Sequence, residues 1–147
     1  MTIFLKNLRI GSFPQLESFL YYNDGIYFGE MSPALRDALC FFNASRPVLN
    51  LRVITLFHWL IGVQLEYEES MTANGDAWRE LDRVLASGHF AGLQKMYMNV
   101  GLSLFGLDTV DSTRPRVQDV VRADFLDLFC ELRKLGISVE VDVTISR

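Results

Sequence analysis

The stretch LQKMYMNV, residues 93–100, carries apolar side chains at alternate positions. A period of two is typical of a β-strand, because successive side chains point to opposite faces of a sheet. The preceding run DAWRELDRVLASG, residues 76–88, spaces its apolar residues as an amphipathic helix does, with Asp76 as the expected N-cap and Gly88 as the expected terminator. A helix that leads directly into a strand predicts one unit of an α/β fold.

The same strand spacing recurs along the chain. The template L-x-x-L-x-L fits Leu93, Met96 and Met98; Leu51, Ile54 and Leu56; Gly136, Val139 and Val141; Leu5, Leu8 and Ile10; and, more loosely, Leu16, Phe19 and Tyr21. Only 11 residues separate the last two matches, too few for a helix between them. Either one of the two is false, or a turn at Phe13-Pro14 joins them.

Helical patterns separate the clear matches. One covers residues 32–43 with Pro33 at its first position, and another covers residues 117–136 with Gly136 at its end. Strands alternating with helices favour parallel pairing and right-handed crossovers. We expect a single domain over residues 1–147, an irregular α/β array of about four mainly parallel strands with helices on one face. The polar stretches 62–76 and 106–116 are expected to be loops.

Composition limits the classes of function. The net charge is −4, and no run of Lys or Arg gives the electrostatic footprint of a nucleic-acid or anionic-membrane partner. The longest apolar stretch, residues 56–65, is about half as long as a membrane span. The N-terminus does not have the pattern of a secretory signal, so we expect a cytoplasmic or nuclear protein that is not secreted.

Part of the chain resembles a known family. The carrying elements are the strand LRVITL, the pattern W-x-x-L-D-x-x-L (Trp78, Leu81, Asp82 and Leu85), Phe90, and L-x-x-M-x-M at 93–98. These resemble the C-terminal repeat region of the F-box and leucine-rich-repeat-like proteins of mushroom-forming fungi, and the opening LKNLRIGSFPQLESF is similar to preceding repeats. The resemblance implies an α/β repeat array that holds other proteins, in a family linked to a ubiquitin ligase through a helical F-box.

The chain departs from that family in two ways. Residues 1–30 have strand and turn patterns where an F-box would be helical. The spacing between matches exceeds the roughly 20–29 residues of regular leucine-rich repeats. The asparagine that follows L-x-x-L-x-L in those repeats is absent here. The link to a ligase is therefore not implied for this chain.

No catalytic, cofactor-binding or metal-binding constellation is visible. Neither G-x-G-x-x-G nor G-x-x-x-x-G-K-[ST] occurs. His58 fits a core histidine better than a catalytic base, and His89 fits a turn. Cys40 and Cys130 are expected to be buried free thiols, and they form no metal-ligand spacing with the histidines. Glu66, Glu68 and Glu69 are either a solvated loop or, if the strand continues, a carboxylate pair for acid–base work or a hard cation.

One surface is a candidate for binding. In parallel strands in register, the residues between the apolar positions form ladders across the sheet face opposite the helices. The candidate interface residues are Arg9, Thr55, Phe57, Trp59, Tyr97, Asn99, Glu140 and Asp142. Aromatic residues mixed with polar ones are typical of interface cores. The alternative is that a second layer, such as the N-terminal 30 residues, covers this face.

Three hypotheses of function follow. The first is a non-catalytic module that recognises another protein through this face. The second is a small-molecule-binding protein or enzyme with a pocket at the C-terminal ends of the strands, lined by Trp59, Gly62, Phe105 and the two long loops. The third, compatible with either, is a homo-oligomer that shares an apolar face.

Overall fold

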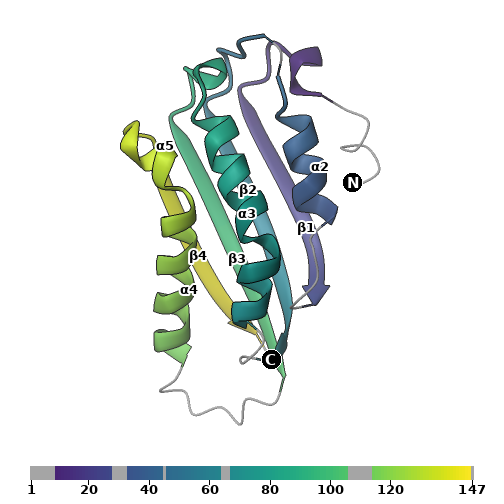
Figure 1. The fold of residues 1–147 in the computed structure, drawn as a ribbon, viewed down its shortest axis with the longest axis vertical. Coiled ribbons are helices and arrows are strands. Elements are labelled where there is room, and N and C mark those ends of the chain that lie inside the picture. Colours follow the sequence, from purple (N-terminus) through teal and green to yellow (C-terminus); the bar gives the residue numbers. More distant parts are fainter. Residues whose placement is uncertain (1–8, 28–32, 45, 64–66, 106–113, 147) are drawn as a thin grey trace.

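The computed structural model describes residues 9–27, 33–44, 46–63, 67–105 and 114–146. Their elements, shown in Figure 1, are η1 (Ile10–Ser12), β1 (Ser18–Tyr27), α2 (Pro33–Phe41), β2 (Val53–Val63), α3 (Tyr67–Leu85), η3 (Gly88–Phe90), β3 (Lys95–Phe105), α4 (Arg114–Leu128), α5 (Cys130–Lys134) and β4 (Ser138–Ser146). Within these ranges, each helix is too short or too polar to cross a bilayer.

The strands form one sheet in the order β1-β2-β3-β4, and every pair is parallel. Helices α2, α3 and α4 lie side by side against the same face of this sheet (Figure 1). The predicted α/β class, the four parallel strands and the placement of helices on one face are therefore confirmed. We call the other side the open face.

The template positions share one register. Ile54 pairs with Met96, and Met96 with Val139, although these positions are 42 and 43 residues apart in the chain. Leu56, Met98 and Val141 form the next row. These side chains point to the helices, and burial of apolar side chains there, worth roughly 1.5–3 kcal/mol each, is what fixes the register.

The edge strand is not the one that the stronger match predicted. Leu5 and Leu8 lie outside the described residues, and Ile10 begins the turn η1. The loose match supplies β1 instead, because its Phe19 stacks on Phe41 of α2 at 4.7 Å and meets Phe42 edge-on at 5.0 Å. Tertiary packing against α2 selects this segment as the strand.

Helix α3 begins nine residues before the expected cap Asp76, at Tyr67. The stretch 62–76 is therefore not a loop, since Gly62 and Val63 complete β2 and the rest belongs largely to α3. Asn74 and Gly75 look like a turn signal in the sequence, but both are buried inside this helix. Packing overrides their low helix propensity.

The acidic cluster does not extend a strand. Glu68 and Glu69 fall in the first turn of α3, and Glu66 lies outside the described residues. Glu68 therefore does not continue β2, as a carboxylate pair on one side of an extended strand would require.

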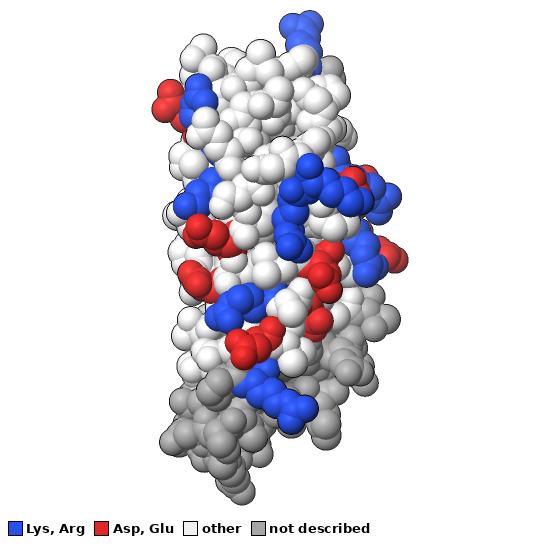
Figure 2. All heavy atoms as spheres, turned by 90° about the vertical axis from the view of Figure 1, so that its left-hand side faces the viewer, with Lys and Arg blue, Asp and Glu red and all other residues white. Residues whose placement is uncertain are grey.

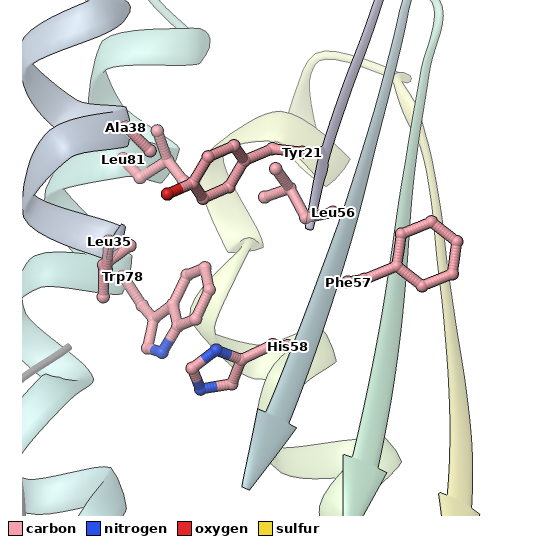
Figure 3. Close-up of a pocket in the computed structure, with 8 residues that line it drawn as sticks. All are labelled: Tyr21, Leu35, Ala38, Leu56, Phe57, His58, Trp78 and Leu81. Carbon is pink, nitrogen blue, oxygen red and sulfur yellow. The ribbon is translucent and has the colours of Figure 1, made fainter. Parts of the chain in front are cut away.

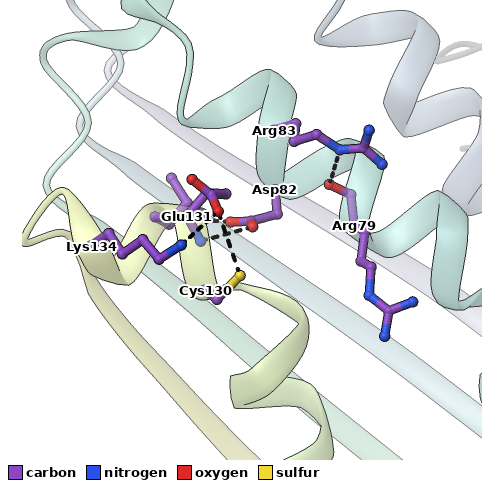
Figure 4. Close-up of polar contacts among 7 residues, drawn as sticks. Arg79, Asp82, Arg83, Cys130, Glu131 and Lys134 are labelled. Atoms are coloured by element: carbon purple, nitrogen blue, oxygen red, sulfur yellow. Dashed lines mark hydrogen bonds and ion pairs between the residues drawn. The ribbon is translucent and has the colours of Figure 1, made fainter.

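The last helical pattern is two helices rather than one. The break falls at Phe129, whose backbone leaves the helical region (φ −102°, ψ 40°) and whose side chain is fully buried. Asp82 of α3 caps the new helix: Oδ2 accepts from the Glu131 N–H at 2.9 Å and Oδ1 from the Leu132 N–H at 3.0 Å (Figure 4). Gly136 ends α5 with φ +79°, as predicted.

Candidate functional site

Rows of side chains cross the open face from strand to strand. They are Leu20, Thr55, Tyr97 and Glu140; Tyr22, Phe57, Asn99 and Asp142; and Trp59, Gly101 and Thr144. Seven of the eight candidate interface residues therefore lie together on this face, in the rows that the spacing predicted.

Arg9 does not belong to this group. It is exposed and precedes η1, outside the sheet, because the edge strand begins at Ser18. Leu20 occupies the place beside Thr55 that Arg9 was expected to take, and Tyr22 continues the face beside Phe57. The loose match at residues 16–21 already contained this signal, since Leu20 stands in it where Thr55 stands in the second strand.

Of the N-terminal 30 residues, Ser18–Tyr27 do not cover this face, because they pair edge-on with β2 in the same sheet, and residues 1–8 and 28–30 lie outside the described parts. Leu20 and Tyr22 are 59% and 48% exposed on the open face. Phe57 points away from the helices, on the opposite side of β2 from Leu56 and His58 (Figure 3).

Two aromatic side chains of the open face are in contact with each other, and a third lies flat on the neighbouring strand. The rings of Tyr22 and Phe57 lie 5.6 Å apart, tilted by 38°. The indole of Trp59 lies over Gly101 of the neighbouring strand, so closely that a Cβ at Gly101 would overlap its ring atoms. Between these rings and β4 is an open depression of about 290 Å³, which Asn99 and Thr144 also line.

The β4 side of the face is charged. Lys95 Nζ lies 3.3 Å from Glu140 Oε1 and 4.4 Å from the ring centroid of Tyr97. Polar contact with Tyr97, and next with Glu140, raises the pKa of Lys95. Asp142 has no ion-pair partner among the described residues. On the side of the molecule that carries α4 and β4, Lys and Arg are interspersed with Asp and Glu (Figure 2).

The helix side of the sheet holds a second group of polar side chains. His58 is buried against Trp78, with ring centroids 5.1 Å apart, and burial lowers the pKa of His58 to about 4 (Figure 3). Burial and then Asp37 raise the pKa of Tyr21 to about 12. A cavity of about 20 Å³ between these side chains has room for one water molecule and not for a substrate. His58 is thus part of the core.

The remaining reactive side chains are dispersed. Cys40 and Cys130 are free but exposed, contrary to the expected burial, because both lie on outward sides of their helices. His89 lies in η3, with Nδ1 3.4 Å from Ser87 Oγ. Within the described ranges, no three His, Cys, Asp or Glu side chains are placed to hold one metal ion.

The predicted small-molecule pocket has little support from the strand order. Ligands of open α/β sheets bind where the order reverses, and the order β1-β2-β3-β4 has no reversal. Trp59 lines the open face instead, and Gly62 lies near the end of β2. The side chain of Phe105, like residues 64–66 and 106–113, lies outside the described parts.

Gly101→Ala is expected to displace the Trp59 indole and to lower the free energy of unfolding by about 1–3 kcal/mol. The indole must leave the sheet because the new methyl group occupies its place. Fluorescence emission should shift to the red and acrylamide quenching should increase, while buried Trp78 contributes a constant background. Gly88→Ala, whose Cβ meets nothing within 4 Å, is the control. An unchanged emission spectrum in Gly101→Ala would contradict the stacking.

No family model, no curated protein and no solved structure matches the chain. The resemblance to F-box and leucine-rich-repeat-like proteins stays a prediction from the sequence.

Proposed function

We propose that the chain is a non-catalytic protein-interaction module of leucine-rich-repeat-like type, which binds another protein through the open face of its sheet. The supporting observation is the pair of exposed apolar side chains, Leu20 and Tyr22, that continue the aromatic surface of Phe57 and Trp59. Large apolar side chains on a strand face are costly in water unless a partner covers them. Leucine-rich repeats also use a surface lined by parallel strands.

The charges of the face indicate the chemistry of the partner. The β1 and β2 half carries Leu20, Tyr22, Phe57 and Trp59, whereas exposed side chains of β4 include the carboxylates of Glu140 and Asp142. The complementary surface is apolar opposite β1 and β2 and basic opposite β4.

A photo-crosslinking comparison tests the proposal. The crosslinking amino acid p-benzoyl-phenylalanine is placed at position 97 on the open face or at position 120, where Val120 is 50% exposed on α4. Extracts of the cytoplasm and nucleus, the predicted compartments, are then irradiated. We expect one protein to be captured from position 97 and not from position 120. Capture from position 120 alone would contradict the proposal.

Tyr97→Ala is expected to weaken binding of the captured, purified protein about tenfold, equivalent to about 1.4 kcal/mol. Tyr97 lies on a central strand in the middle of the face and is partly exposed, so its removal deletes contact area without opening the core. Calorimetric titration measures the affinity. Val120→Ala is the control, and its affinity for the partner should equal that of the unchanged protein. Equal affinities for all three proteins would show that binding occurs elsewhere.

Two other occupants of the open face would give different experimental results. A second copy of the chain would appear as a dimer in sedimentation, dissociated by Tyr97→Ala. A small molecule would stabilise the fold in a thermal-shift screen, by about 2.7 kcal/mol at 100 times its dissociation constant.

A further inference from the structure

The depression on the open face has walls of an unusual composition. Tyr22, Phe57 and Trp59 supply three aromatic rings along one side, and the Trp59 indole lies flat over Gly101 because that residue has no side chain. Asn99 and Thr144 supply polar groups along the other side. The volume of about 290 Å³ is open to solvent and admits a side chain from another molecule.

The electrostatics of these walls favour a cation. The face of an aromatic ring carries negative potential and attracts guanidinium or ammonium groups. Asp142 of β4 lies opposite Asn99 of β3 in the strand register. It is on the same face as Thr144, two residues before it. The nearby Lys95 is already engaged with Glu140, whereas Asp142 has no ion-pair partner among the described residues. The depression therefore presents aromatic faces, and the carboxylate of Asp142, which has no ion-pair partner among the described residues, lies beside it on the next strand.

We propose that this depression receives an arginine side chain of the protein partner. The guanidinium group stacks on an aromatic ring with its plane and donates hydrogen bonds from its edge. This suits a depression with rings on one side and Asn99 on the other, and with Asp142 next to Asn99 on the neighbouring strand. The inference rests on the proposed function, because it assigns one contact of the same open face.

Small probes test the assignment before any partner is known. Nα-acetyl-arginine methylamide is titrated into ¹⁵N-labelled protein, and Nα-acetyl-citrulline methylamide, which replaces the guanidinium by a neutral urea of similar shape, is the matched probe. The indole N–H of Trp59 reports binding, and that of buried Trp78 is the internal reference. We expect a saturable shift of Trp59 alone, with about fivefold weaker binding of the citrulline probe.

Asp142→Asn should weaken binding of the arginine probe about two- to fivefold and leave the citrulline probe unchanged. Asp119→Asn, on the exposed side of α4, is the control without effect on either probe. Added salt should reduce binding of the arginine probe only. Equal affinities of the two probes, or no shift of Trp59, would overturn the inference.

The failure of this inference is distinguishable from failure of the proposed function. If the probes bind equally while Tyr97→Ala still weakens the captured protein, the open face binds a partner without an arginine in the depression. If Tyr97→Ala has no effect on that protein, the proposed function itself fails, whatever the probes do.

Discussion

Asp82→Ala is expected to lower the free energy of unfolding by about 3–5 kcal/mol. The carboxylate is 2% exposed and accepts the Glu131 N–H at 2.9 Å and the Leu132 N–H at 3.0 Å (Figure 4). Hydrogen bonds to a charged group contribute about 1.5–3 kcal/mol each, and their loss leaves two N–H donors at the start of α5 without a partner. Denaturation with urea measures the difference.

Asp76→Ala is the matched control, because Asp76 lies on the same helix and is fully exposed beside Arg79. Its removal should change the stability by less than about 1 kcal/mol. The loss of unfolding free energy in Asp82→Asn should fall between those of Asp82→Ala and Asp76→Ala. An amide keeps one acceptor but turns a donor toward the second N–H. A loss of under 1 kcal/mol for Asp82→Ala would contradict the capping role.

Acidification from pH 7 to pH 4 is expected to cost about 3 kcal/mol of unfolding free energy through His58 alone. Its pKa is about 4 in the folded protein, because burial disfavours the imidazolium, against 6.5 for an exposed histidine. Between these values the unfolded chain binds the proton and the folded chain does not, so stability falls as the pH falls through this range. Urea denaturation at intervals of half a pH unit measures the slope.

His58→Gln should remove this slope, because glutamine does not titrate, although its own stability will be lower at pH 7. His89→Gln, in the η3 turn, should keep the slope and is the control. The range from pH 6.5 to pH 5 is the most informative, since few carboxylates titrate there. A slope that persists in His58→Gln would show that another group is responsible.

The register of the sheet was predictable because it depends on spacing alone. Apolar residues at alternate positions must face the helices, and a shift by one residue would turn Ile54, Met96 and Val139 to the solvent. The rows of Thr55 with Tyr97, and of Phe57 with Asn99, follow from the same constraint.

Other features depend on contacts between distant segments. The edge strand is decided by the packing of Phe19, which stacks on Phe41 and meets Phe42 edge-on, and no local sequence pattern predicts these contacts. The break before α5 depends on Asp82, 50 residues away from Leu132 in the chain. The pattern W-x-x-L-D gave one signal of this contact. Trp78 and Leu81 are buried in the core, so Asp82 beside them is buried too and faces α5.

The candidate site was predicted in its central part and missed at its edge. Phe57, Trp59 and Tyr97 were assigned correctly to one face because their strands were recognised. Leu20 and Tyr22 were missed because the stronger template match lay upstream of the true strand. The depression beside Gly101 was not predictable, since it depends on where the Trp59 indole lies.

Hydroxyl-radical footprinting with the captured protein shows which face of the sheet the partner covers. The reagent oxidises exposed aromatic and aliphatic side chains, and mass spectrometry compares their rates with and without the partner. If the partner binds the open face, we expect protection of Tyr22, Trp59 and Tyr97 in the complex and no change at Leu135, which is 61% exposed at the end of α5. Protection of Leu135 with unchanged oxidation of the three rings would contradict it.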